Sequence, residues 1–188
     1  MYLRLFHSYL HGYVSSRIIN LSRNPAGIPL CVAATKLDGL VLSLTPFSHS
    51  YNYRSAILYG TAVPVTDPAE KLYAMKLITN SVVPERWENT RVPPNDAEMA
   101  ATAVLRMTVS SAAAKVRAGP PGDDRKDLNK EVAGEIWTGV VPVWETLGTP
   151  IHVGDGPGGT PPEHVVRYIE ERNRREREFA EGAVGKEW

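Results

Sequence analysis

The sequence predicts a mainly β fold with helices at its sides, which is a small antiparallel β-barrel of the α+β class. Several apolar segments of strand length follow one another along the chain. Glycine and proline, 15 of each, divide the chain into short pieces. Most links between the predicted strands are short, which favours an antiparallel barrel over a β-α-β fold.

The first part of the chain is expected to begin with a strand from Leu3 to Leu10 and a helix from Ser16 to Arg23. The segment from Ile28 to Lys36 is apolar on both faces and predicts a strand that is buried on both sides. Asp38-Gly39 lies between two apolar runs and predicts a hairpin turn, because these residues tolerate a positive φ angle. A further strand is expected from Ser55 to Val65.

Capping signals define the next helices. Asp67 and Glu70 are typical of a helix start and predict a helix from Pro68 to Val82. Asn95 and Glu98 have the same spacing and predict a second, shorter helix.

Two more strands are expected, one around Ala103 to Val109 and one from Ile136 to Trp144. Trp137 and Trp144 are seven residues apart, so they are expected on opposite faces of the last strand.

The composition changes after Leu147. Residues 148–162 are rich in glycine and proline, and residues 163–181 predict a highly charged helix. The apolar stripe of this helix is short, so we expect the helix to be exposed or to lie on a partner. The chain therefore divides into a barrel domain, residues 1–147, and a linker with an appended C-terminal helix, residues 148–188.

Composition excludes several classes of protein. Lys+Arg and Asp+Glu are 21 each, which removes the electrostatic case for a partner such as nucleic acid or an acidic membrane. The single cysteine, Cys31, excludes an internal disulfide and a cysteine-built zinc site, and we predict no metal site. We find neither a secretory signal nor an apolar run of about 20 residues, so a soluble, cytoplasmic protein is expected.

A first candidate site lies where the first strand ends and a helix begins, from His11 to Arg17. Free amides at such a junction can bind an anion, Ser15 and Ser16 add hydroxyl donors, and Arg17 adds a planar guanidinium that matches phosphate oxygens. The alternative is a capping serine beside a solvated arginine.

Polar and aromatic side chains form two other candidates. Tyr53 and Arg54 precede an apolar strand and could contact a flat aromatic ligand, although a solvated loop also explains them. Lys115 and Arg117 are two residues apart at the end of a strand, which suits an anion or two ordinary surface cations.

Five stretches in this order resemble one family: YLHGYVSSR, GIPLCVAATKLDGLVLS, FSHSYNYRSAILYGTAVPVTDPAEK, AAAKVRAGPP and EIWTGVVPV. This family is the pyridoxamine 5′-phosphate oxidase-like flavin-nucleotide-binding proteins, in the branch related to the nitroimidazole-resistance reductases. The resemblance covers about Tyr2 to Pro150. Members carry further strands before the position of Tyr2, so we expect this chain to begin within the barrel.

The resemblance implies an FMN-binding split β-barrel of the antiparallel Greek-key type. It also implies a homodimer with FMN at the subunit interface. The FMN phosphate would be bound by His11, Ser16 and Arg17. The isoalloxazine would lie beside Tyr53, Arg54 and Ser55. Lys115 and Arg117 match the late basic pair of the family. Trp137 matches the tryptophan of the last barrel strand, which approaches the flavin from the partner subunit.

The expected function is that of an FMN-dependent oxidoreductase that acts on a small molecule. We assign no catalytic residue, because the sequence contains no defensible pair of nucleophile and base. The alternative is a non-catalytic module that binds or sequesters flavin or haem.

Overall fold

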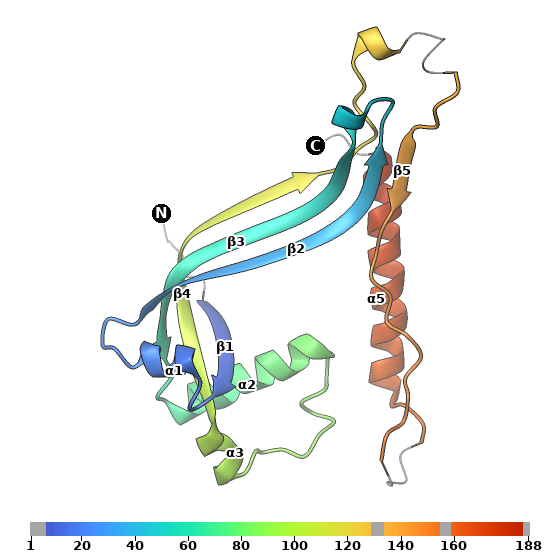
Figure 1. Cartoon of the computed structure of the whole chain (residues 1–188). Helices are drawn as coiled ribbons and strands as arrows, with labels where there is room; N and C mark the ends of the chain where they lie inside the picture. The colour runs from blue at the N-terminus through green and yellow to red at the C-terminus, as the bar shows by residue number, and fades with distance from the viewer. Residues whose placement is uncertain (1–6, 129–133, 155–158, 186–188) are drawn as a thin grey trace, which may run out of the picture. The chain divides into compact units, whose positions relative to one another are not determined.

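The computed structural model describes residues 7–128, 134–154 and 159–185 (Figure 1). The chain forms two compact units. Unit 1 consists of Met1–Val32, Ile57–Ala113 and Pro161–Tyr168, and unit 2 consists of Ala33–Ala56, Ala114–Thr160 and Ile169–Trp188. Three strands contribute residues to both units, and these are β2 (Ile28–Leu42), β3 (Ser50–Pro64) and β4 (Thr102–Arg117). The predicted domain boundary after residue 147 stays a prediction.

One five-stranded sheet has the order β1-β4-β3-β2-β5, where β1 is His7–Tyr13 and β5 is Gly139–Pro142. The pairs β1–β4 and β2–β5 are antiparallel. The predicted mainly antiparallel fold with peripheral helices is therefore confirmed, but the sheet is open, with β1 and β5 at its edges. The beginning of the first predicted strand, residues 3–6, lies outside the described residues.

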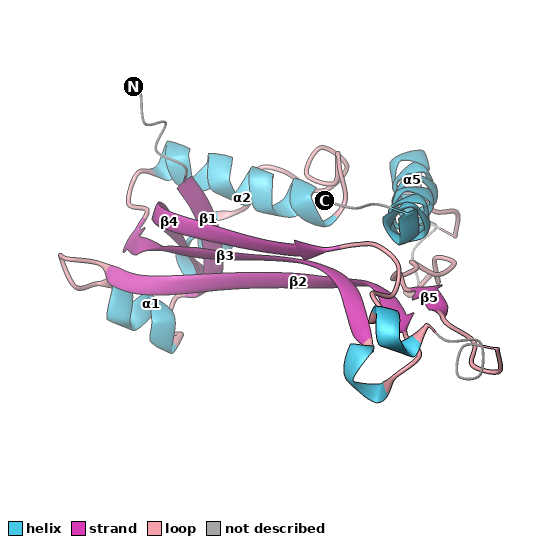
Figure 2. Ribbon diagram, turned by 90° about the horizontal axis from the view of Figure 1, so that it is seen from above, coloured by secondary structure: helices cyan, strands magenta, loops and turns pink. Residues whose placement is uncertain are grey.

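The core of unit 1 forms between the sheet and the short helix α1 (Arg17–Ser22). Ile19 of α1 packs with three buried residues of the sheet, which are Ala62, Leu105 and Met107. Figure 2 shows α1 and α2 (Pro68–Val82) on opposite sides of the sheet in this unit. Alternate residues of β4 therefore face different helices.

Helix α2 begins as the capping signal predicts, because the Asp67 carboxylate accepts a hydrogen bond from the Glu70 backbone N–H at 2.9 Å. The Glu70 carboxylate accepts from the Tyr9 hydroxyl at 3.0 Å and from the Arg106 guanidinium at 2.8 Å. Tyr9 and Arg106 face each other across β1 and β4, so one carboxylate joins the start of α2 to two strands. In α3 (Asp96–Ala101), the predicted capping box is complete.

The predicted hairpin at Asp38-Gly39 is wrong, because β2 continues through both residues to Leu42. The connection to β3 follows Leu42 and contains a 3-10 turn at Pro46–Ser48. Asp38 pairs with Arg54 of β3, so its carboxylate belongs to the sheet and not to a turn. A Cβ atom at Gly39 would lie 2.8 Å from a methyl group of Val140, so glycine here permits the close approach of β5.

The last predicted strand, Ile136 to Trp144, is also shorter than expected. Only Gly139–Pro142 pairs, with Gly139 opposite Leu42 and Pro142 opposite Gly39. Both tryptophans therefore lie outside β5, and the prediction that they occupy opposite faces of one strand is wrong.

Helix α5 (Glu163–Gly182) buries polar side chains rather than the short apolar stripe. Its buried residues include His164, Glu176 and Ala180, whereas Val166 is 38% exposed. The expectation of an exposed helix is thus wrong for these residues, whereas its alternative, a helix that lies on a partner, stays a prediction. Among the described residues, no helix is long and apolar enough to cross a membrane.

Candidate functional site

The junction between β1 and α1 in unit 1 contains a hydroxyl group without a partner. Ser16 is the N-cap residue of α1, but its side chain makes no capping hydrogen bond. Its Oγ atom is buried and has no hydrogen-bond partner. Arg17, the first helical residue, is exposed, as are His11 and Ser15. A buried unpaired hydroxyl is costly, so Ser16 is suited to donate to an acceptor such as a phosphate oxygen.

A second group of predicted residues meets on β3 and β4 in unit 2. The Lys115 ammonium lies over the Tyr53 ring, 5.8 Å from its centroid. The Ser55 hydroxyl donates to the Lys115 carbonyl at 3.1 Å. Tyr53, Ser55 and Lys115 therefore form one aromatic and cationic surface.

Arg117 has a different partner from Lys115. Its guanidinium donates to Oδ1 of the fully buried Asn52 at 2.6 Å, and the Asn52 amide donates to the Gly119 carbonyl at 3.0 Å. The two cations that were predicted to share an anion are thus held by different side chains.

Arg54 forms the centre of an ionic network in unit 2. Its guanidinium makes two short hydrogen bonds to Asp38, at 2.7 and 2.9 Å, and stacks on Phe179 at 3.5 Å from the ring centroid. The hydrogen bond to Asp38 raises the pKa of Arg54, although burial acts in the opposite direction. The predicted contact of Arg54 with a flavin stays a prediction.

Glu176 of α5 extends this network. Its carboxylate lies 2.6 Å from the Lys36 ammonium and 3.6 Å from the Arg54 guanidinium. The hydrogen bond from Lys36 lowers the pKa of Glu176 below its ordinary value, although burial opposes this shift.

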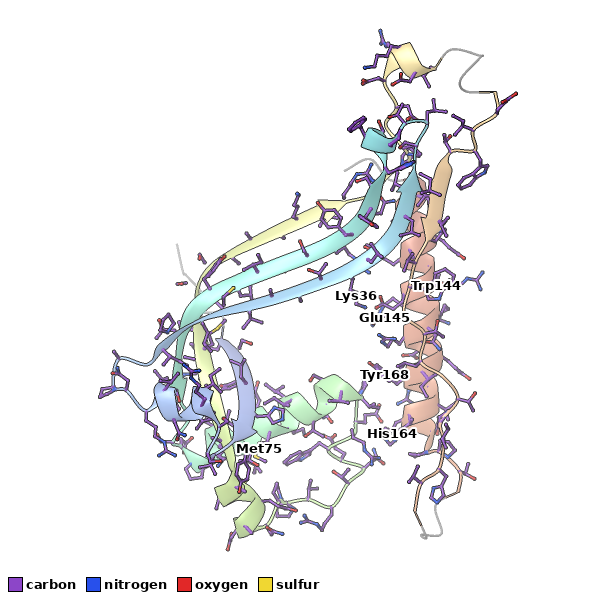
Figure 3. All side chains as sticks on the ribbon, viewed as in Figure 1. Lys36, Met75, Trp144, Glu145, His164 and Tyr168 are labelled. Atoms are coloured by element: carbon purple, nitrogen blue, oxygen red, sulfur yellow. The ribbon has the colours of Figure 1, made fainter. Side chains whose placement is uncertain are left out.

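A cavity of about 390 Å³ lies beside this network within unit 2. Its walls come from β2, from the segment after β5 and from α5, and the lining residues are Thr35, Lys36, Leu37, Asp38, Val143, Trp144, Glu145 and Glu176. Figure 3 shows Lys36, Trp144 and Glu145 close together. An indole face beside charges of both signs suits a planar polar molecule.

The remaining predicted residue, Trp137, lies in the loop before β5 and is 65% exposed. The structure thus places the predicted residues in two groups. The group in unit 1 is His11, Ser15, Ser16 and Arg17. The group in unit 2 is Tyr53, Arg54, Ser55, Lys115, Arg117 and Trp137.

Among the described residues, sequence analysis missed six polar side chains that the structure buries, which are Ser22, Asp38, Ser43, Asn52, His164 and Glu176. On α5 the missed signal is a spacing of four in one place only, since Glu176 and Ala180 lie on one helical face. Nε2 of His164 is buried and has no hydrogen-bond partner. Within the described segments, no three His, Cys, Asp or Glu side chains are grouped so that they could hold a metal ion.

Comparison with known proteins supports the resemblance found in the sequence. The sequence model of the pyridoxamine 5′-phosphate oxidase family matches residues 7–116. A search of curated proteins finds no significant match.

Two solved structures are similar to this chain over most of its length. The flavocytochrome Anf3 from Azotobacter vinelandii is 30% identical, with a TM-score of 0.73, over 86% of this chain and 72% of that chain. The FAD and haem binding protein from Mycobacterium smegmatis is 31% identical, with a TM-score of 0.75, over 87% of this chain and 77% of that chain. Sequence motifs, fold and matched region agree, and the chain belongs to the pyridoxamine 5′-phosphate oxidase family.

Proposed function

We propose that this protein binds a flavin nucleotide and works as an oxidoreductase on a small molecule. The family and the flavin-binding relative support this proposal. The observation that carries it is the buried, unpaired hydroxyl of Ser16 at the β1–α1 junction. A flavin supplies hydride or electron transfer when bound, and the protein binds it, orients it and excludes water.

Each group of residues has a definite task in this proposal. The Ser16 hydroxyl donates to a phosphate oxygen, and Arg17 adds the paired N–H donors of its guanidinium. Tyr53 supplies an aromatic ring and Lys115 a positive charge, and the two suit a planar ligand. Dimerisation would bring residues of two subunits to each flavin. The cytoplasmic location of the protein stays a prediction.

Binding experiments with three flavins test the role of Ser16. We expect FMN to bind more tightly than riboflavin, which lacks the phosphate, and Ser16→Ala to remove most of this difference. The matched control is Ser81→Ala, an exposed serine in α2. A protein that stays colourless after incubation with FMN and with FAD would contradict flavin binding.

The identity of the flavin is a separate question. The family resemblance predicts FMN, whereas the Mycobacterium smegmatis relative is described as binding FAD. Chromatography of the flavin released from the purified protein by heat distinguishes the two, and FMN is the expected product. Release of FAD alone would leave the flavin proposal intact and overturn the choice of FMN.

A second candidate function is that of a module that binds flavin or haem without turnover. The relatives support the haem part of this candidate, because one is described as a flavocytochrome and the other as an FAD and haem binding protein. Anaerobic mixing with NADH or NADPH separates the candidates. Bleaching of the flavin absorbance is expected for an oxidoreductase that uses these donors, and an unchanged spectrum favours the non-catalytic module.

A further inference from the structure

We propose that the cavity beside Trp144 in unit 2 binds an uncharged aromatic heterocycle whose edge carries a hydrogen-bond acceptor next to an N–H donor. The carboxamide of nicotinamide and the amino edge of adenine both have this arrangement. This inference goes beyond the proposed function, because it concerns a second ligand and a different face of the sheet.

The cavity lies where β2 loses its neighbour at the edge of the sheet. β5 pairs only with Gly39 to Leu42 of β2. The β2 residues that precede this pairing and line the cavity, Thr35 to Leu37, therefore have no strand beside them on that edge in the described part of the chain. The volume of about 390 Å³ falls within the range of pockets that hold small molecules.

Hydrogen bonds hold the wall opposite β2 in place after β5 ends. The Val143 backbone N–H donates to the Asp38 carbonyl at 3.1 Å. Further along, the Asn173 side chain of α5 donates to the Leu147 carbonyl at 2.9 Å and accepts from the Leu147 N–H at 2.8 Å. The segment that carries Trp144 is therefore fixed at both ends, and its indole, 38% exposed, is a preformed aromatic wall of the cavity.

Two polar groups at the cavity have hydrogen-bonding capacity to spare. The Lys36 ammonium has three N–H donors, and its one ion-pair partner among the described residues is Glu176, at 2.6 Å. The Glu145 carboxylate accepts from Arg172 through Oε2, which leaves Oε1 as an acceptor without a partner in residues 7–128, 134–154 and 159–185. Figure 3 shows both side chains beside Trp144. A ligand that lies along the indole can therefore accept from Lys36 and donate to Glu145.

The balance of charge at the cavity favours an uncharged ligand. Asp38 is paired with Arg54, and Glu176 with Lys36, so each buried carboxylate at the cavity already has its cation. An added anion would face these carboxylates, and an added cation would compete for them with side chains that are already in place. Hydrogen bonds to Lys36 and Glu145 then determine which edge of a neutral ring is recognised.

The cavity and the surface proposed for the flavin ring are on different faces of β3. Tyr53 and Arg54 are consecutive, so their side chains point to opposite faces of the strand. The Tyr53 ring lies under Lys115, whereas Arg54 contacts Phe179 of α5 and the Asp38 carboxylate that lines the cavity. The flavin surface and the cavity are therefore separate sites.

The site depends on a part of the chain that the family model does not include. The match ends at residue 116, whereas Trp144, Glu145 and Glu176 follow it. The cavity is thus formed by the C-terminal part of this chain together with β2, and a relative without these residues would lack it.

Isothermal titration calorimetry with nicotinamide and with adenosine tests the proposal on the full chain saturated with FMN. We expect at least one of the two compounds to bind saturably, and FMN not to compete with it. Methyl nicotinate and purine riboside are the matched ligands, because they keep the rings of nicotinamide and adenosine but lack the amino group. Each should bind about tenfold more weakly than its parent compound. Binding of nicotinamide alone indicates a site for a carboxamide, and binding of adenosine alone indicates a site for an amino-substituted base.

Variants test the assigned contacts. Trp144→Ala removes the indole and Glu145→Ala removes the acceptor, and each should weaken binding at least about tenfold. Trp144→Phe should keep most of the affinity, because an aromatic ring remains. The matched controls are Trp87→Ala, in unit 1, and Asp124→Ala, an exposed carboxylate of unit 2 that pairs with a lysine. Neither residue lines the cavity, so both controls should bind the heterocycle like wild type.

Each outcome decides one point. If neither compound binds, or if FMN prevents the binding, the proposed site is wrong. Equal affinity for wild type and Trp144→Ala would place the ligand elsewhere, and equal affinity for a parent compound and its matched ligand would overturn the hydrogen bond to Glu145. The comparison of matched ligands uses wild type, so it decides the proposal even if a variant unfolds. A protein that binds no FMN would contradict the proposed function and leave the titration with nicotinamide and adenosine valid.

Discussion

At the scale of single residues, Arg17 is the strongest candidate for phosphate recognition. It is exposed at the first position of α1, directly after the unpaired Ser16 hydroxyl. We expect Arg17→Ala to weaken FMN binding by about 2–3 kcal/mol, because a charge-assisted contact to phosphate is lost. Arg17→Lys should recover only part of the affinity, since an ammonium cannot donate two parallel hydrogen bonds. Fluorescence titration measures both variants.

The control for this prediction is Arg23→Ala. Arg23 follows the same helix and is exposed, and its only hydrogen bond from the side chain among the described residues is a long one to the Val14 carbonyl. Its removal should leave FMN affinity unchanged. Equal affinity for wild type and Arg17→Ala would show that the phosphate binds elsewhere.

Asp38 and Arg54 make a second prediction at this scale. The Asp38 side chain is only 4% exposed, and Arg54 is its charged partner. Arg54→Ala leaves that carboxylate buried and unpaired, so it should lower the free energy of unfolding by about 3–5 kcal/mol in urea denaturation. The double variant Asp38→Ala/Arg54→Ala should lose less than the sum of the single variants. The exposed ion pair of Arg174 offers a control, and Arg174→Ala should change stability by less than about 1 kcal/mol.

These residues also show what sequence could predict. Asp67, Asn95 and Glu98 were predicted correctly because a helix cap depends on groups within three residues of each other. Asp38-Gly39 has the local chemistry of a turn, but its role is decided by Arg54, 16 residues away, and by β5. Long-range pairing therefore overrode the local preference.

At the scale of elements, Glu176 links part of α5 to the strands of unit 2 through its ion pairs with Lys36 and Arg54. The Lys36 hydrogen bond lowers the pKa of this glutamate in the folded protein from its ordinary value of 4.5. A depressed pKa means that the ionised carboxylate stabilises the folded state above the unfolded-state pKa. This contribution is lost as the pH falls through the lower, folded-state pKa.

Glu176→Gln should therefore destabilise the protein near neutral pH and make less difference in acid. Unfolding in urea at several pH values below and above 4.5 measures this change. Glu178→Gln, an exposed residue of the same helix, is the control and should show a smaller effect. A wild-type advantage over Glu176→Gln that stays constant through the acid range would contradict the assigned role of the carboxylate.

The elements differ in how well sequence defines them. The starts of α2 and α3 follow from local caps, whereas β4 extends beyond its predicted apolar core to Arg117. Its last residues are small or polar, such as Ser110, Ala112 and Ala114, and alternation alone does not identify them as a strand. The burial of parts of α5 was missed because the buried residues include His164 and Glu176, and polar residues are expected outside.

At the scale of the whole molecule, we expect a homodimer. Ile18 and Leu21 of α1 are 39% and 55% exposed, and they line an open apolar groove with Ile28 and Leu30. Contiguous apolar surface of this kind is typical of a protein interface. A stable two-fold interface should bury more than about 1,000 Å² and include this groove.

Light scattering at micromolar concentration tests the dimer. Release of flavin on dilution gives a second measurement. Leu21→Asp should convert the dimer to a monomer, since a carboxylate in an apolar interface loses its hydration. Val82→Asp is the matched control, because Val82 is a 67% exposed apolar residue that ends α2. Residues of both subunits are expected to contact each flavin, so dilution of the dimer should release it. A monomer that retains its flavin at these concentrations would refute both the dimer and the shared site.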